Sequence, residues 1–557
     1  MSRGLRRFSE KKREEIRNHP YFAKWRENVL KNAEEYLNTE PPRIKYSDMH
    51  SYYITGKRSD ARQQGVYHTR MQTFFNAYML TEDEKYLTPL ADDLWNICDF
   101  ECWTGPWHIK ESEPLEARFT ELDLGSTGLG ANIAEILYFI GDKLPELVYR
   151  RAKDQVTRRI INSYRDKTNE EIYWFYRNTN WSAFCTCQVF LCYYYLASDE
   201  ELNEQLPRML KSMECYLSGL DDEGCCIEGY GYWNYGFGEF CTFADLLRDY
   251  TEGKINLFDD EKVHMVALFQ QKIAMNDKEC LSFSDCGRGF KPFAPISHLL
   301  KSIYDDIEIP AIKAAEHSHI SLRELVCEEP SLENCEFKPK SHSFKNAQWF
   351  VYHSDKYSLG AKAGHNKETH NHNDVGTFMF SKEGKISFCD LGSGEYVADY
   401  FGANRYSILV CSSRGHSVPI INGKLQEKNV DDKANVLEQS DSVFRFTYGR
   451  VYDDPTLKKL ERGFECLEDS VVLTDRYEFD KTPESVVERF VSDLEIKVEE
   501  GRLICHHTIV EFDPEIFEAS VSSEPFATAP GRTATAYLAD LKVKEPKANM
   551  TLKFTIK

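Results

Sequence analysis

The hydrophobic pattern of the chain changes its period once, close to residue 335. From about residue 10 to residue 325, apolar residues recur at the spacing of one helix face, as in Ile133, Ile136, Leu137 and Ile140. Breaks rich in glycine and aspartate separate these stripes. Helices joined by such breaks are typical of the successive helix pairs of an α/α toroid, which we expect in this half.

Beyond residue 335 the period is two. Short stretches of β-branched and aromatic residues alternate with polar turns at 348–353, 376–380, 385–388, 444–447, 471–473 and 552–556. This pattern predicts an antiparallel β-sandwich. The segment after about residue 480 fits either a continuation of the sandwich or a small separate β-layer.

The boundary falls in the polar, proline-containing segment 328–343. A chain of 557 residues is too long for one core, so two or three domains are expected. We therefore predict an α+β multidomain protein, with an α/α toroid domain over 1–330 and an antiparallel β-sandwich domain over 340–557.

The formal net charge of −21 argues against nucleic acid and anionic membranes as partners. An anionic sugar would also be repelled at long range, so a site for one needs its own local positive charge. We find no apolar run long enough for a membrane span and no signal peptide, and we expect a cytoplasmic protein. The 17 cysteines are scattered and fit reduced thiols. Zinc bound by the close cysteine pairs is disfavoured, because neither pair has CxxC spacing.

The strongest local signal is a cluster of histidines within residues 361–380, formed by His365, His370 and His372 with Asp374. If residues 370–374 are extended, the last three of these side chains project from one face. An apolar core has little use for so many titratable groups, so the cluster as a whole predicts a functional site.

Asp390 and His416 flank strand-like runs, and a sheet would bring both beside His372. Two imidazoles and a carboxylate suit a divalent metal, Zn or Mn. The competing interpretation is that Asp390 caps a turn.

Two motifs of the helical half combine aromatic and polar residues. Asn180 and Trp181 follow a polar loop and precede an apolar helix, so Asn180 is either functional or a helix N-cap. In residues 227–240 tyrosines alternate with glycines, which places phenols at a surface or packs aromatic rings around a turn.

Residues 365–376 and 414–426 together resemble the C-terminal motifs of heparinase II/III-like polysaccharide lyases. Residues 178–184 and 221–240 resemble the toroid motifs of the same superfamily, in the expected order. Within it the chain looks nearest to the broad-specificity glycosaminoglycan lyases. The resemblance implies an N-terminal incomplete α/α toroid as the catalytic domain, a C-terminal antiparallel β-sandwich and a cleft between them.

Carried over by position, the resemblance makes Tyr232 the catalytic phenol, Asn180 the group that binds the uronate carboxylate and His370 the cleft histidine. It also implies a divalent metal with a structural role, held by His372, Asp390 and His416. Several relatives have a histidine beside the carboxylate-binding residue, where this chain has Trp181, so the preference between uronic acid epimers is not carried over. Five residues of polar and aromatic segments are weaker candidates for substrate contacts, each with a structural role as the alternative: Arg70, His108, Trp181, Tyr235 and Arg405.

The implied reaction is β-elimination on a uronic-acid-containing glycan such as a glycosaminoglycan oligosaccharide. Abstraction of the C5 proton leaves charge on the adjacent carboxylate, which Asn180 and His370 would stabilise. Tyr232 would remove that proton as a phenolate, its pKa of about 10 being lowered by positive charge, or return a proton to the departing O4. His370 would serve as the base for the opposite epimer.

Three other functions remain open from the sequence. One is a lyase for alginate or another uronate oligosaccharide, and one is a non-catalytic glycan-binding protein. The third is a glycoside hydrolase, which needs paired carboxylates; the candidates are Asp221, Asp222, Glu223 and Glu228. The expected partner is an anionic uronate oligosaccharide or polysaccharide, and homo-oligomer formation is left open.

Overall fold

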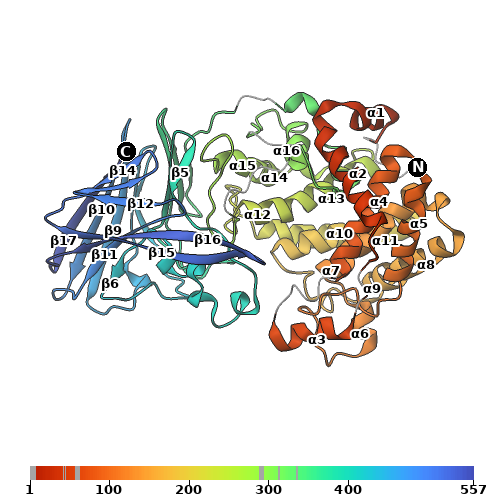
Figure 1. Cartoon of the computed structure of the whole chain (residues 1–557), viewed down its shortest axis with the longest axis horizontal. Coiled ribbons are helices and arrows are strands. Elements are labelled where there is room, and N and C mark those ends of the chain that lie inside the picture. The colour runs from red at the N-terminus through yellow and green to blue at the C-terminus, as the bar shows by residue number, and fades with distance from the viewer. Residues whose placement is uncertain are drawn as a thin grey trace.

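The computed structural model describes residues 8–41, 43, 45–56, 63–287, 294–310, 314–333 and 337–557. The helices form one half of the molecule and the strands form the other, side by side along the long axis (Figure 1). Among the described helices, none has both the length and the apolar character that a bilayer crossing requires. The described cysteines are all free thiols, and most are buried.

The main helices of the N-terminal half are α1 (Glu10–Asn18), α2 (Ala23–Leu37), α3 (Tyr46–Thr55), α4 (Gln63–Thr81), α5 (Leu87–Ile97), α6 (Leu115–Thr120), α7 (Leu124–Ile140), α8 (Glu146–Val156), α9 (Ser163–Asp166), α10 (Asn180–Leu196), α11 (Asp199–Ser218), α12 (Tyr230–Tyr232), α13 (Gly238–Tyr250), α14 (Glu261–Ala267), α15 (Phe269–Lys272), α16 (Ala294–Lys301) and α17 (Leu322–Leu325). Two π-helical segments interrupt them, η5 (Thr157–Asn162) and η6 (Trp233–Phe237).

Helices α7 and α10 pack against each other at the centre of this half. Both are apolar on nearly every side, and almost all of their residues are buried. The predicted stripe at Ile133, Ile136, Leu137 and Ile140 lies in this core, each residue at most 3% exposed. Asp123 caps α7, because its side chain accepts a hydrogen bond from the backbone of Ser126.

The strands of the C-terminal half are β1 (His342–Phe344), β2 (Trp349–His353), β3 (Tyr357–Lys362), β4 (Phe378–Lys382), β5 (Lys385–Phe388), β6 (Ile420–Ile421), β7 (Asn435–Gln439), β8 (Val443–Thr447), β9 (Leu457–Cys466), β10 (Val471–Phe479), β11 (Val486–Ser492), β12 (Ile496–Glu499), β13 (Arg502–Cys505), β14 (Thr508–Glu511), β15 (Phe517–Ala529), β16 (Arg532–Val543) and β17 (Asn549–Ile556).

The described strands form three antiparallel sheets. Their orders are β1-β2-β3-β4-β5, β12-β13-β14-β17-β10-β9-β8-β7 and β15-β16-β11-β6. Phe490 of β11 packs on Phe378 and Phe388 of the five-stranded sheet and on Phe554 of the eight-stranded sheet, which makes a sandwich with one apolar interior. The segment after residue 480 continues this sandwich, since its strands lie in two of the three sheets.

The five-stranded sheet is buried on both faces. Along β2, Phe350 faces the sandwich interior, whereas Trp349 and Val351 belong to the core of the helical half. Trp349 meets Phe283 of that half at a ring distance of 5.2 Å. The hairpin of β15 and β16 also reaches toward the helices (Figure 1). The expected toroid followed by an antiparallel β-sandwich is confirmed, with an extensive contact between the two.

Candidate active site

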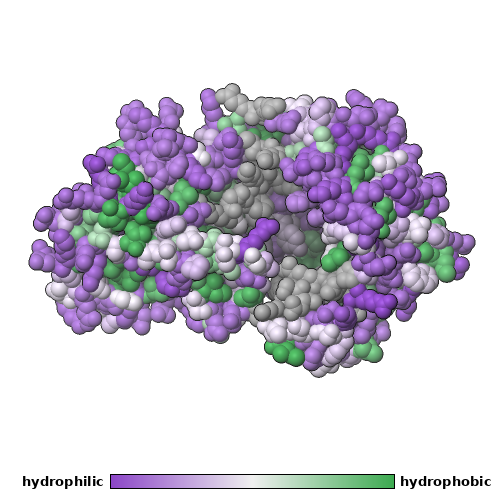
Figure 2. All heavy atoms as spheres, viewed as in Figure 1, coloured by the Kyte–Doolittle hydropathy of each residue, from purple (hydrophilic) through white to green (hydrophobic). Residues whose placement is uncertain are grey.

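A cavity of about 670 Å³ opens between the two halves of the molecule. The helical half contributes most of its lining, including Asn180 and Tyr232, and the sheet half contributes His370, Tyr396 and Phe401. The space-filling view shows a hollow on one face where the two halves meet (Figure 2). The three residues assigned to catalysis by resemblance therefore share one cavity.

Tyr232 is positioned by a short, irregular stretch of chain. It ends α12 and leads directly into the π-helical turn η6, a rare conformation that is frequent at functional sites. Gly229, just before α12, has a φ of 89°, and a Cβ there would lie 2.7 Å from the Cβ of Cys286. Only glycine fits this backbone, so the turn carrying Tyr232 packs directly on the segment around residue 285.

Asn180 is the first residue of α10, and the N-cap is Thr179, so the alternative of a simple N-cap is wrong. A Cβ at Gly236 would lie 3.1 Å from the Cβ of Asn180, which shows how closely η6 approaches the start of α10. Asn180 is only 6% exposed, lines the cavity, and its amide makes no hydrogen bond to any residue in the described part of the chain. A buried amide without a protein partner is available for a ligand.

His370 lies in the loop between β3 and β4 and has a φ of 55°, in the left-handed region. The expectation that residues 370–374 are extended is therefore wrong, because this turn breaks the alternation of side chains. The consequence is that the His370 ring reaches the cavity, with its centroid 4.1 Å from that of the Tyr232 ring.

The side chain of Asp285 receives four donors. Its Oδ2 lies 2.7 Å from Nδ1 of His370, and its Oδ1 is 3.0 Å from Nε2 of His372. The hydroxyl of Tyr400 and the guanidinium of Arg405 also donate to Oδ1, at 2.6 and 2.9 Å. This fully buried carboxylate, together with Tyr396 and Tyr400, was missed from the sequence, where Asp285 is a lone acidic residue in a polar loop.

The electrostatics of the site keep the carboxylate of Asp285 ionised and the neighbouring phenol of Tyr232 neutral. Burial alone would raise the pKa of Asp285, but hydrogen bonds from His370 and His372 and the charge of Arg405 hold that pKa well below its usual range. Burial raises the pKa of Tyr232 well above that of a free phenol, and the carboxylates of Asp285 and Glu228 raise it further. The hydrogen bond between the hydroxyls of Tyr232 and Tyr396, 2.9 Å long, opposes this shift only in part. Tyr232 is thus a neutral phenol in the ligand-free site, not the phenolate considered from the sequence.

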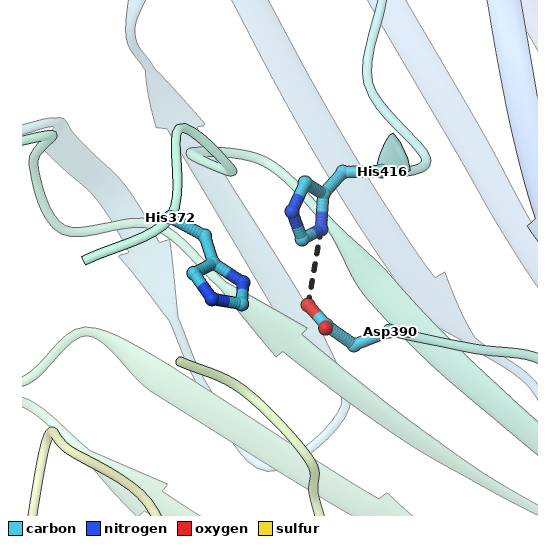
Figure 3. Close-up of side chains that lie close together, drawn as sticks. All are labelled: His372, Asp390 and His416. Carbon is cyan, nitrogen blue, oxygen red and sulfur yellow. Dashed lines mark ion pairs between the residues drawn. The ribbon is translucent and has the colours of Figure 1, made fainter. Parts of the chain in front are cut away.

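His372, Asp390 and His416 form a buried group suited to a metal ion. One ligand atom from each lies within 4.8 Å of the others, and the three side chains converge (Figure 3). Nδ1 of His372 has no hydrogen-bond partner in the described structure, and Nδ1 of His416 lies 3.1 Å from Oδ2 of Asp390. The other ring nitrogens are engaged, His372 Nε2 by Asp285 and His416 Nε2 by the carbonyl of Val410 at 2.8 Å. Three converging ligand atoms, with the outer ring nitrogens held by a carboxylate and a carbonyl, fit a divalent ion such as Zn or Mn.

The rest of the histidine cluster lies elsewhere. Asp374 pairs with the buried ammonium of Lys362 at 2.9 Å, and Nδ1 of His365 accepts the backbone N–H of Lys367. The predicted single-faced cluster is thus divided, with His370 at the cavity and His372 at the candidate metal site.

The structure separates the weaker candidates for substrate contact. His108, Trp181 and Tyr235 line the cavity. Arg70 does not line it; it is 4% exposed and pairs with Asp93 at 3.1 Å, so its charge is satisfied inside the helical half. Arg405 is held by Asp285 behind His370 and is likewise absent from the lining. The prediction that these two arginines contact the substrate is therefore corrected, and both have structural roles.

The toroid followed by an antiparallel sandwich is the fold of heparinase-like and chondroitin-lyase-like polysaccharide lyases. Among solved structures, the chain is similar to a heparinase III, with a TM-score of 0.63 and 13% identity over 97% of this chain and 91% of that chain. A heparan sulfate lyase mutant from Pedobacter heparinus has a TM-score of 0.59 and 12% identity over 98% of this chain and 92% of that chain. A chondroitin AC lyase from Streptomyces coelicolor A3 has a TM-score of 0.56 and 10% identity over 97% of this chain and 80% of that chain. No protein-family model matches the chain, and no curated protein sequence matches it. At these identities the likeness is one of fold.

Proposed function

We propose that the chain is a polysaccharide lyase that cleaves uronic-acid-containing glycans, of glycosaminoglycan type, by β-elimination. The observation that carries the proposal is the convergence of a buried amide, a neutral phenol and a carboxylate-bound imidazole on one cavity, in Asn180, Tyr232 and His370. Two of the three solved structures named above are lyases by their names and the third is named a heparinase, which supports the same class for this chain.

The geometry supports His370 as the base. Asp285 is ionised and accepts hydrogen bonds only, so Nδ1 of His370 carries the shared proton, and in the neutral ring Nε2 holds the lone pair. Nε2 makes no hydrogen bond with any described residue, and the ring lines the cavity. Such a carboxylate-held imidazole has its tautomer and orientation fixed for taking a proton.

The proposed elimination uses one base, one acid and one group that binds the carboxylate. Nε2 of His370 takes the C5 proton of the uronate, and the electron pair forms the C4–C5 double bond as the C4–O4 bond breaks. Tyr232, which remains protonated because burial raises its pKa, donates its proton to O4. The amide of Asn180 binds the uronate carboxylate as charge develops on it, an interaction whose loss costs roughly 10²–10³ in rate. A divalent ion at His372, Asp390 and His416 would brace the loop that carries His370.

A hydrolase finds less support. Of its four candidate carboxylates, Asp222 is exposed, Asp221 is bound by the backbone of Cys225, and Glu223 is bound by the backbone of Asn346. Glu228 lies close enough to interact with His370, yet none of the four lines the cavity.

The test is incubation with unsulfated chondroitin, hyaluronan, heparan and alginate oligosaccharides. We expect new ultraviolet absorbance from the conjugated double bond with a glycosaminoglycan substrate. Absorbance with alginate alone would support the alternative uronate lyase. Binding without any absorbance would support a non-catalytic glycan-binding protein, and reducing ends without absorbance would indicate a hydrolase.

A further inference from the structure

The cavity contains a second imidazole held by a buried carboxylate. Nδ1 of His108 lies 2.7 Å from Oδ2 of Asp123, and Asp123 is fully buried at the start of α7. Its oxygens also accept backbone N–H groups, from Ser126 at 2.7 Å and from Gly105 at 3.2 Å. The construction repeats that of His370 and Asp285, at a different part of the cavity wall.

The hydrogen bonds fix the chemistry of the His108 ring. A carboxylate that already accepts two N–H groups is an acceptor, so Nδ1 of His108 carries the shared proton and Nε2 of the neutral ring is an acceptor. Nε2 has no hydrogen-bond partner in the described chain, and His108 lines the cavity.

The cap of α7 does not depend on His108. Asp123 forms a capping box with Ser126 through its other oxygen, and the capping box alone satisfies the helix start. A structural role for the pair would be to tie the loop that carries His108 to α7.

Aromatic rings surround His108. Its ring meets Trp181 edge-on at a centroid distance of 4.7 Å and lies 5.9 Å from that of Trp107, and both indoles line the cavity. Indole rings cover the apolar C–H face of a sugar, while a nearby acceptor binds a hydroxyl. Among the cavity-lining residues that the structure describes, none is a lysine or an arginine. An uncharged sugar suits this wall better than a second carboxylate or a sulfate, because the Asp123 carboxylate lies directly behind the imidazole.

We propose that Nε2 of His108 accepts a hydrogen bond from a hydroxyl of an uncharged sugar that lies against Trp181, in a subsite next to the one for the uronate. The inference rests on the proposed lyase function and extends it to the neighbouring ring, which in a glycosaminoglycan is a hexosamine. His108 thus determines specificity by binding the neighbouring sugar, whereas His370 and Tyr232 carry out the proton transfers.

Two substitutions of one residue separate the subsite from the structural alternative. In His108→Asn the amide N–H replaces Nδ1–H toward Asp123, but nothing replaces Nε2. In His108→Gln the amide reaches the position of Nε2, but the link to Asp123 is lost. With unsulfated chondroitin and hyaluronan hexasaccharides, we expect His108→Asn to raise KM about tenfold with little change in kcat, and His108→Gln to retain more of the affinity.

The binding readout avoids turnover. Calorimetry with the same hexasaccharides on a Tyr232→Phe background should show the same weakening of about tenfold for His108→Asn. Trp181→Leu, which leaves the link to Asp123 untouched, should weaken binding as well. His264→Asn is the matched control, because His264 pairs with Asp306 at 2.8 Å away from the cavity.

These experiments give different results for failure of the subsite and failure of the proposed function. Wild-type KM and affinity in His108→Asn, with a loss in His108→Gln, would overturn the subsite in favour of the structural role. Absence of both turnover and binding in the wild-type protein with every uronate glycan would overturn the proposed function itself, and the subsite with it.

Discussion

Nδ1 of His370 and Oδ2 of Asp285 lie 2.7 Å apart, although 85 residues separate them in the chain. The carboxylate comes from the helical half and the imidazole from a loop of the sheet half, so the contact between the halves completes the His370–Asp285 pair. The same carboxylate holds His372 of the candidate metal site through its other oxygen. Asp285 therefore positions the proposed base and links it to the candidate metal ligands.

Replacing Asp285 by Asn should lower kcat by roughly 10²-fold or more, because the amide no longer fixes the His370 tautomer that carries its lone pair on Nε2. KM should change little, since Asp285 does not line the cavity. Steady-state absorbance assays on the best substrate measure both. Asp306→Asn, which removes the carboxylate of a His–Asp pair away from the cavity, should behave like wild type. Equal activity of both variants would refute the positioning role.

Tyr232→Phe should abolish turnover while leaving binding and fold intact, because the ring stays against His370 and only the proton donor is lost. Tyr396→Phe removes the hydrogen bond to Tyr232 but not the donor, so a partial loss is expected. Turnover is followed by absorbance, binding by calorimetry and fold by circular dichroism. The exposed Tyr176, changed in the same way, is the control. Near-normal turnover by Tyr232→Phe would contradict its assignment as the acid.

Removal of a bound divalent ion should lower both Tm and activity. The three ligand side chains are fully buried and their ligand atoms converge. An ion that binds only the folded state stabilises it, by about 4 kcal/mol at a thousandfold excess over Kd. Elemental analysis should find about one equivalent of Zn or Mn per chain. His416→Ala should lose the ion and reproduce the effect of a chelator, and His264→Ala should not. Purified protein that lacks any ion and keeps its Tm in chelator would argue against the site.

The sequence predicted the two halves because hydrophobic periodicity is a local property, and Ile133 or Phe378 is buried on the side that its period requires. It predicted less of the site. From the residues alone only the histidine cluster stood out, and the roles of Asn180 and Tyr232 came from resemblance. Asp285 could not be predicted, because its importance arises from partners 85 to 120 residues away. The left-handed turn at His370 overrode the alternation assumed for that loop.

The pH dependence of stability offers a test in a different part of the molecule. Glu328 is fully buried, and burial raises its pKa to about 7 from 4.5, against the opposing hydrogen bond from the backbone N–H of Ala315. The folded chain thus binds this proton more tightly than the unfolded chain does. The contribution to stability is complete below about pH 4.5 and is lost as the pH rises through about 7.

Glu328→Gln removes the ionisable group. The free energy of unfolding of the variant, relative to that of wild type, should therefore rise by on the order of 1–3 kcal/mol as the pH is raised from about 5 to about 8. Calorimetric or fluorescence unfolding of both proteins at the two pH values gives the difference. Glu316→Gln, at an exposed position nearby, should show no such gain. A Glu328→Gln variant that is destabilised equally at both pH values would show that this carboxyl stays neutral, or ionised, across the whole range.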